Sequence, residues 1–208
     1  MKMRATLLAL LGAGIVTLGC GGDPPKAELD AATAALQAAK SAEAGKYASS
    51  ELSSAEGANN KANGAYTEQD GKLFKDWDSV KPLISDAKSK ADQAKSSATQ
   101  AKGRAKSAAE SAIASADAAV SAARASLSGA PSGKGTEGDI EQLGADLDAA
   151  SAGLSSARSA ASRGDYDVAS SGAKAAAAKA NGVSGGVDQA VARYNELVEK
   201  NTPWYMRI

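Results

Sequence analysis

The stretch VKPLISDAKSKADQAKSSATQAKGRAKSAAESA, residues 80–112, carries the most regular apolar pattern in the chain. Its apolar residues recur at alternating steps of four and three, which is the heptad spacing of a helix that packs along one seam, as in a coiled coil. The seam positions are Val80, Ile84, Ala87, Ala91, Ala94, Ala98, Ala101, Ala105, Ala108 and Ala112. Alanine side chains are small, so we expect neighbouring helices to approach closely here. The stretch predicts one long central helix.

The composition extends the helical prediction to the rest of the chain. The 208 residues include 50 alanines and 25 serines, and no segment alternates convincingly as a strand. Alanine is the best helix former, whereas the scarcity of large aliphatic residues predicts a thin core. We therefore predict an all-α fold, an elongated antiparallel helical bundle of helical hairpins with an Ala-rich heptad seam.

Glycine, proline and serine divide the chain around this helix. The predicted segments are an N-terminal helical hairpin over 26–71, an aromatic joint and the central helix over 72–128, a Gly/Pro/Ser loop over 129–138, a C-terminal helical hairpin over 139–202 and an aromatic tail over 203–208. The joint contains Phe74 and Trp77. Whether the turns at Gly45 and Gly164 are tight hairpins or kinks in longer helices stays open.

Smaller signals predict the helix ends. Ser49 or Ser50 would cap the second helix of the first hairpin, and Asp165 would cap the last helix. The helix after Ser49 is expected to fade through residues 63–72, and the last helix to weaken at NGVSGGV, residues 181–187, because of their glycines.

Two segments repeat at an offset of 118 residues. LDAATAALQAAKSA (29–42) matches LDAASAGLSSARSA (147–160), and KANG (61–64) recurs at 179–182. The shared Leu, Asp and Asn-Gly positions are harder to attribute to alanine bias than the alanines themselves. We interpret the matches as two related helical hairpins.

The beginning of the chain has the pattern of a secretory signal peptide over residues 1–19. Lys2 and Arg4 precede a short uncharged apolar run, which ends at the single cysteine, Cys20. Thr17-Leu18-Gly19-Cys20 resembles the lipobox of bacterial lipoproteins, with Thr17 where Leu or Val is usual. The alternatives are a leftover buried cysteine and an ordinary signal peptide cut nearby.

The lipobox resemblance implies cleavage after Gly19 and acylation of Cys20 with a diacylglycerol thioether and an N-acyl chain such as palmitate. Residues 20–25 would then be a lipid-anchored linker stiffened by Pro24 and Pro25. In bacteria that follow the usual sorting rule, Gly21 rather than Asp after the cysteine implies the outer membrane, facing the periplasm.

A second resemblance covers PKAELDAATAALQAAKSAEAGKYASSELSSAEGANNKA, residues 25–62. It is similar to the helical domain of unknown function 4398, which has an Ala-rich helix, a Gly-x-Tyr-Ala turn followed by Glu-Leu, and a second Ala-rich helix. GDYDVA (164–169) is similar to the turn of that family. Members are commonly envelope lipoproteins, some joined to a peptidoglycan-binding domain. No segment of this chain resembles that domain, so peptidoglycan contact has no motif to support it.

The side chains usual in enzyme active sites are scarce. The chain has no histidine, and its one thiol is expected to be acylated. The close carboxylates Asp76/Asp78 and Asp165/Asp167 are better explained as caps and solvated faces than as acid–base pairs. We predict no catalytic residue, no metal site, no cofactor other than the covalent lipid, and no enzymatic activity.

The charges are segregated along the chain. Residues 72–106 carry a net charge of +5, whereas residues 23–70 and 137–188 each carry −4. Lys81, Lys88, Lys95 and Lys102 recur every seven residues beside the seam. They would either pair with acids on neighbouring helices, which we favour, or form a basic stripe for a partner. No aromatic side chains are interleaved with these lysines, so the pattern does not indicate nucleic-acid binding.

The C-terminal residues NTPWYMRI gather Trp204 and Tyr205 with Met206 and Ile208. They would either fold back as a plug onto the aromatic joint, which we favour, or form an exposed docking tail.

These observations lead to a functional prediction. The protein is expected to be a lipid-anchored, non-enzymatic structural or interaction protein of the bacterial cell envelope, a helical rod or scaffold tethered through Cys20. Its partners would be the membrane, through the lipid, and an envelope protein or a second copy. The alternative is a periplasmic adaptor or holdase-like module whose hairpins bind a client protein.

Overall fold

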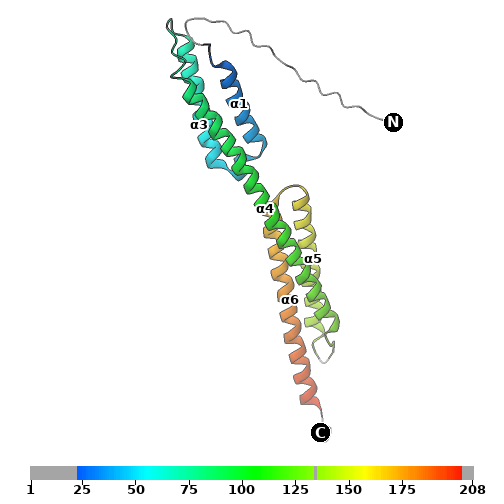
Figure 1. The fold of residues 1–208 in the computed structure, drawn as a ribbon. Coiled ribbons are helices and arrows are strands. Elements are labelled where there is room, and N and C mark those ends of the chain that lie inside the picture. The colour runs from blue at the N-terminus through cyan, green and yellow to red at the C-terminus, as the bar shows by residue number, and fades with distance from the viewer. Residues whose placement is uncertain (1–22, 134, 203–208) are drawn as a thin grey trace, which may run out of the picture. The chain divides into compact units, whose positions relative to one another are not determined.

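The computed structural model describes residues 23–133 and 135–202, and all regular secondary structure in these residues is helical. The elements are α1 (Lys26–Ser41), α2 (Ala44–Tyr47), α3 (Ser49–Asp70), α4 (Lys81–Gly129), α5 (Glu137–Ser162) and α6 (Tyr166–Asn201) (Figure 1). The prediction of an all-α helical bundle is confirmed.

The chain forms two compact units that divide between Ser96 and Ser97. The first unit contains α1, α2, α3 and the beginning of α4. The second contains the remainder of α4 together with α5 and α6. Helix α4 therefore contributes residues to both cores.

The core of the first unit is formed by three helices and the residues before α4. Its buried residues are Leu29, Ala32, Ala58, Ala62, Trp77, Val80, Ile84 and Ala87. These positions lie three or four residues apart on each helix, so each helix buries a single stripe. Half of the residues are alanine, which brings the helix backbones close together.

The core of the second unit follows the same plan and is larger. It combines Ala112, Ala116, Val120 and Ala123 of α4 with Leu147, Ala150, Leu154 and Ala157 of α5 and Ala173, Ala176, Ala180, Val183 and Val187 of α6. A smaller cluster of Ala109, Ala160 and Ala169 lies beside it. Three of the five residues that are not alanine in the large cluster are valines, so this core also contains little bulky side-chain volume.

The sequence repeat corresponds to a structural repeat. The buried residues Leu29, Ala32, Leu36 and Ala39 of α1 lie 118 positions before Leu147, Ala150, Leu154 and Ala157 of α5. The same offset relates Ala55, Ala58 and Ala62 of α3 to Ala173, Ala176 and Ala180 of α6. The two hairpins therefore bury the same face of equivalent helices.

The alanine seam of α4 holds through Ala98 and then changes register. Val80, Ile84, Ala87, Ala91, Ala94 and Ala98 are all buried. Ala101 and Ala105 are only half-buried, Ala108 is exposed, and burial resumes at Ala109. Continuing the heptad to Ala108 was therefore wrong. The seam thus takes a step of four residues, from Ala105 to Ala109, where the heptad would take three, and this stutter lets α4 present different faces to the two cores.

The first turn does not lie at Gly45. Glu43 adopts the left-handed conformation with φ of 61°, and Gly45 lies within the short helix α2. The predicted caps Ser49 and Ser50 are also wrong, because Ala48 is the N-cap of α3 and no side chain caps this end. The chain nevertheless reverses direction here, since α1 packs against α3.

The second turn matches the prediction more closely. Gly164 has a φ of 84°, a conformation that glycine adopts without steric cost, and Asp165 is the N-cap of α6. The Asp165 side chain makes no capping hydrogen bond, so the cap is one of position only. Helices α5 and α6 pack against each other, so this turn also closes a hairpin.

Helix α3 ends at Asp70, near the end of the predicted weak segment 63–72, whereas the predicted weak segment 181–187 does not interrupt α6. Helix α3 continues through residues 63–70, and α6 is continuous through residues 181–187. A Cβ atom at Gly186 would lie 2.5 Å from Leu143 Cδ2. This glycine therefore makes room for a leucine of α5, while Val183 and Val187 anchor the same segment in the core.

Candidate interaction surfaces

Lys81 and Lys88 are exposed and pair with acids close to them in the sequence. Lys81 Nζ donates to Asp78 Oδ1 at 2.8 Å, and Lys88 Nζ donates to Asp92 Oδ2 at 2.7 Å. The hydrogen bond from Lys81 lowers the pKa of Asp78, and the same bond raises the pKa of Lys81. The favoured interpretation of pairing with acids on neighbouring helices is therefore wrong for Lys88, whose partner lies on α4 itself. For Lys81 the main partner is Asp78, and Glu28 of α1 adds a smaller electrostatic effect that also raises the pKa of Lys81.

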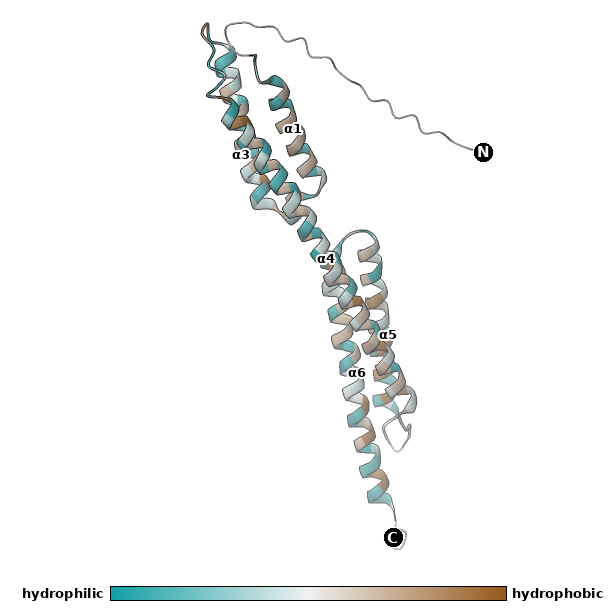
Figure 2. Cartoon of the chain, in the orientation of Figure 1, coloured by the Kyte–Doolittle hydropathy of each residue, from teal (hydrophilic) through white to brown (hydrophobic). Residues whose placement is uncertain are grey.

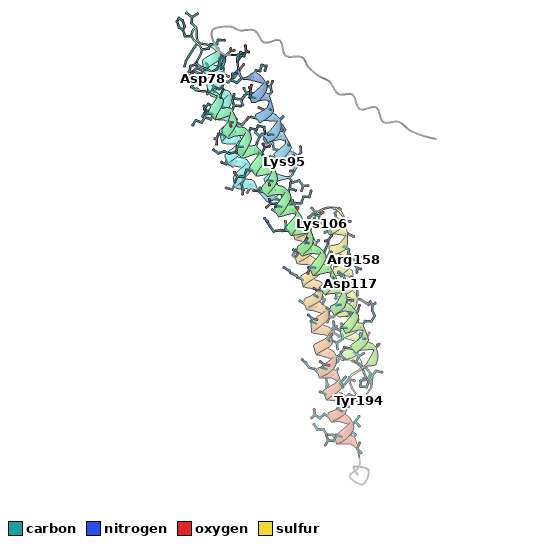
Figure 3. The ribbon with its side chains drawn as sticks, viewed as in Figure 1. Asp78, Lys95, Lys106, Asp117, Arg158 and Tyr194 are labelled. Carbon is teal, nitrogen blue, oxygen red and sulfur yellow. The ribbon has the colours of Figure 1, made fainter. Side chains whose placement is uncertain are left out.

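Lys95 and Lys102 lie further along α4. Lys95, labelled in Figure 3, is exposed, whereas Lys102 is half-buried where the seam changes register. The four lysines therefore do not share one environment, although their spacing is regular. A uniform basic stripe would require all four ammonium groups to be equally open to a partner.

The ion pairs that join helices use other residues. Lys40 of α1 pairs with Glu56 of α3 at 2.7 Å. In the second unit, Arg158 of α5 pairs with Asp117 of α4, and Figure 3 shows the two residues next to each other. A further pair joins Arg193 of α6 to Asp139 of α5 at 2.8 Å.

The sequence analysis did not predict these ion pairs, although the internal repeat indicated one of the residues in two of them. Lys40 and Arg158 occupy equivalent positions at the offset of 118, so the repeat could have indicated a cation at one place in both hairpins. The partner could not be transferred in the same way, because the position equivalent to Glu56 is Lys174. Exposed pairs of this kind contribute about 0–1 kcal/mol each.

A shallow groove of about 290 Å³ lies between α1 and α4 in the first unit. It is lined by Glu28, Ala31, Lys81, Ile84, Ser85 and Lys88. Because Lys81 and Lys88 donate to Asp78 and Asp92, their charges are already partly balanced at the rim. The groove shows that the start of α1 lies beside the start of α4.

The aromatic joint splits into a buried and an exposed part. Trp77 is 5% exposed and stacks on Tyr66 of α3 with ring centroids 5.0 Å apart. Leu73 and Phe74, in contrast, are 91% and 88% exposed. The predicted joint lies in the loop between α3 and α4, but its two aromatic side chains have different environments. The loop presents two adjacent apolar side chains to solvent.

The described residues show neither a metal-binding cluster nor a membrane-spanning helix. Across residues 23–133 and 135–202, no group of three or more His, Cys, Asp or Glu side chains is placed to hold a metal ion. No helix in this part of the chain is long and apolar enough to cross a membrane. Figure 2 shows why, since hydrophobic and hydrophilic residues are interspersed along the labelled helices.

The signal peptide, the lipidation site and the aromatic tail predicted from the sequence lie outside the described ranges, and with them four candidate site residues. They are Gly19 and Cys20 at the predicted lipidation site, and Trp204 and Tyr205 in the C-terminal tail. Lipid attachment and the choice between a packed and an exposed tail therefore stay predictions.

Comparison of the chain with family models, with curated proteins and with solved structures finds no match. The resemblance of residues 25–62 to the domain of unknown function 4398 also stays a prediction.

Proposed function

We propose that this protein is a lipid-anchored, non-enzymatic helical scaffold of the bacterial cell envelope, tethered through Cys20 to the outer membrane and facing the periplasm. The observation that carries the proposal is the sequence Thr17-Leu18-Gly19-Cys20 at the end of a basic and then apolar leader. Several acyl chains make a stable anchor, since each buried methylene contributes about 0.8 kcal/mol.

The start of the described structure supports a short tether. Pro25 is the N-cap of α1, so the helical part begins six residues after Cys20. An extended chain spans at most about 3.6 Å per residue, which limits this connection to about 22 Å. An anchor at Cys20 would keep the start of α1 close to the bilayer.

The surface chemistry supports a protein partner rather than a nucleic acid. Lys81 and Lys88, which would begin a basic stripe, donate to Asp78 and Asp92. A polyanion would have to break these pairs before it bound. We therefore propose an envelope protein or a second copy of this chain as the partner.

The adaptor or holdase-like module is the second candidate, favoured by the alanine-rich cores. Small side chains contribute little burial energy, so a hairpin could separate from α4 at low cost and expose an apolar stripe. A dye that fluoresces on exposed apolar surfaces distinguishes the two candidates. Strong binding of the dye to the native protein supports the module, and absence of binding supports the scaffold.

Anchoring is tested with Cys20→Ser and a matched variant, Gly21→Asp. Cys20→Ser removes the sulfur that would carry the diacylglycerol, so we expect loss of fatty-acid labelling and release from the membrane fraction. Gly21→Asp leaves the cysteine in place, so we expect normal labelling but a shift to the inner membrane. If Cys20→Ser still labels with fatty acid and still sediments with membranes, the proposed function is wrong.

A further inference from the structure

The loop between α3 and α4 holds two apolar side chains in solvent. Leu73 and Phe74 are more exposed than Val168, which is 62% exposed, and these are the three exposed large hydrophobic residues of the described ranges. Val168 is thus a single large side chain, whereas the loop offers an adjacent pair. Exposed apolar side chains that lie together can mark an interaction site, whereas single ones are normal on a protein surface.

The exposure of this pair is built into the structure. On one side, Lys72 pairs with Glu68 at 2.8 Å; on the other, Lys75 Nζ donates to Asp70 Oδ1 at 2.7 Å. Three residues after Phe74, Trp77 is buried against Tyr66. The flanking residues are therefore held against the first unit, and Leu73 and Phe74 are left projecting between them.

The loop lies at the same end of the first unit as the start of α1. Trp77 and Val80 share a core with Leu29 and Ala32 of α1, and Glu28 lines a groove with Lys81. Figure 1 shows the start of α1 and the α3–α4 loop together at one end of this unit. An anchor at Cys20, no more than about 22 Å of extended chain from Lys26, would hold this end toward the bilayer.

We propose that Leu73 and Phe74 insert into the lipid surface to which the protein is anchored; this inference rests on the proposed lipidation of Cys20. Leucine and phenylalanine are side chains that enter the boundary between headgroups and acyl chains. Two side chains would bind a bilayer weakly by themselves. After anchoring, however, the second contact becomes intramolecular, and its high effective concentration makes a weak contact sufficient.

The charges around the loop indicate which lipids matter. Lys72 and Lys75 flank the apolar pair, but Glu68 and Asp70 pair with them and Asp76 and Asp78 follow. With two lysines and four acids among these residues, the loop gains no attraction from an anionic surface, unlike a polybasic segment. Insertion should therefore depend on the apolar side chains and be nearly the same in zwitterionic and anionic membranes.

The test uses the full lipidated protein with a fluorescent probe at position 74. Cys20 is the only cysteine and its thiol is consumed by acylation, so Phe74→Cys supplies one thiol for labelling. The matched control is Val168→Cys, which places the same probe on an exposed apolar position of the second unit. Both proteins are reconstituted into vesicles of phosphatidylcholine, with and without phosphatidylglycerol, that contain a quencher on the acyl chains.

We expect the acyl-chain quencher to reduce fluorescence at position 74 at least about threefold more than at position 168, in both kinds of vesicle. Equal quenching at the two positions, or quenching only with phosphatidylglycerol, would overturn the insertion. A probe at position 74 that is unquenched in vesicles but shifts in whole envelopes would assign the loop to a protein partner and overturn it as well.

Mass spectrometry of the same samples shows whether Cys20 is acylated and so distinguishes a failure of the proposed lipidation from a failure of the proposed insertion. Acylated protein with an unquenched probe at position 74 contradicts the insertion alone. Protein without acyl chains contradicts the proposed function, and the insertion with it. Circular dichroism of Leu73→Ser and Phe74→Ser supplies a folding check, since side chains this exposed should leave the melting temperature unchanged.

Discussion

The hairpins α1–α3 and α5–α6 bury equivalent positions, but their equivalent cations form ion pairs with different helices. Leu36 and Leu154 are equivalent and both buried, as are Ala55 and Ala173. The cation at the end of each first helix is also kept, as Lys40 or Arg158. Lys40 pairs within its hairpin, to α3, whereas Arg158 pairs with α4.

A second difference lies inside the two cores. In the first hairpin, Asn59 is 8% exposed, and its Oδ1 accepts a hydrogen bond from Thr33 Oγ1 at 3.3 Å. The equivalent positions in the second hairpin are Ala177 and Ser151, and the Ser151 hydroxyl donates to the Leu147 carbonyl of its own helix. A repeated apolar stripe thus sets the packing, while the polar positions around it are free to differ.

The largest expected effect comes from removing an equivalent leucine in each hairpin. Leu36→Ala and Leu154→Ala should each lower the free energy of unfolding by about 2–5 kcal/mol, because a cavity replaces a buried side chain. Hydrogen exchange should accelerate mainly in α1 and α3 for the first variant, and mainly in α5 and α6 for the second. Identical exchange patterns would show that the two units do not have separate cores.

An intermediate effect should distinguish the two registers of α4. Ala109 is fully buried and Ala108 is exposed, although the heptad of the first unit would bury Ala108. Ala109→Leu should cost about 1–3 kcal/mol through overpacking. Ala108→Leu should stay within about 0.5 kcal/mol of wild type. Thermal melts of both variants decide the register. A larger loss of stability for Ala108→Leu than for Ala109→Leu would support the uninterrupted heptad instead.

The smallest expected effect comes from making the second hairpin resemble the first. Lys174 is exposed and occupies the position of Glu56, so Lys174→Glu offers Arg158 an acid on α6. The gain should be at most about 1 kcal/mol and should shrink with added salt. The informative measurement is a double-mutant cycle, in which Asp117→Asn costs less with Lys174→Glu present than without it. An unchanged cost would mean that Arg158 does not exchange partners.

The sequence predicted the helices well because their signals are local. Period-3.6 burial, the turn at Gly164 and the seam from Val80 to Ala98 all depend on residues close together in the chain. The stutter after Ala98 was missed because alanine stands at positions 101, 105, 108, 109 and 112 alike. With the same residue on adjacent faces, only the packing partner decides which face is buried.

Other errors came from reading small residues as breakers. Glycine was taken to weaken residues 181–187, but Gly186 provides space for Leu143 in the hairpin. Gly45 was taken as the turn, but Glu43 adopts the left-handed conformation instead. Of the candidate site, the four lysines were located but the pairing of Lys81 and Lys88 was not. The exposed Leu73 and Phe74 were missed, since exposure is decided by tertiary packing.

The continuity of α4 has a consequence for folding order. Helix nucleation is slow and unfavourable, because several residues are fixed for the first hydrogen bond, whereas each later residue adds a bond as it is ordered. A single helix from Lys81 to Gly129 serves both cores. Once one unit has assembled, its segment of α4 is already a nucleus, and the helix can elongate into the other unit without a second nucleation event.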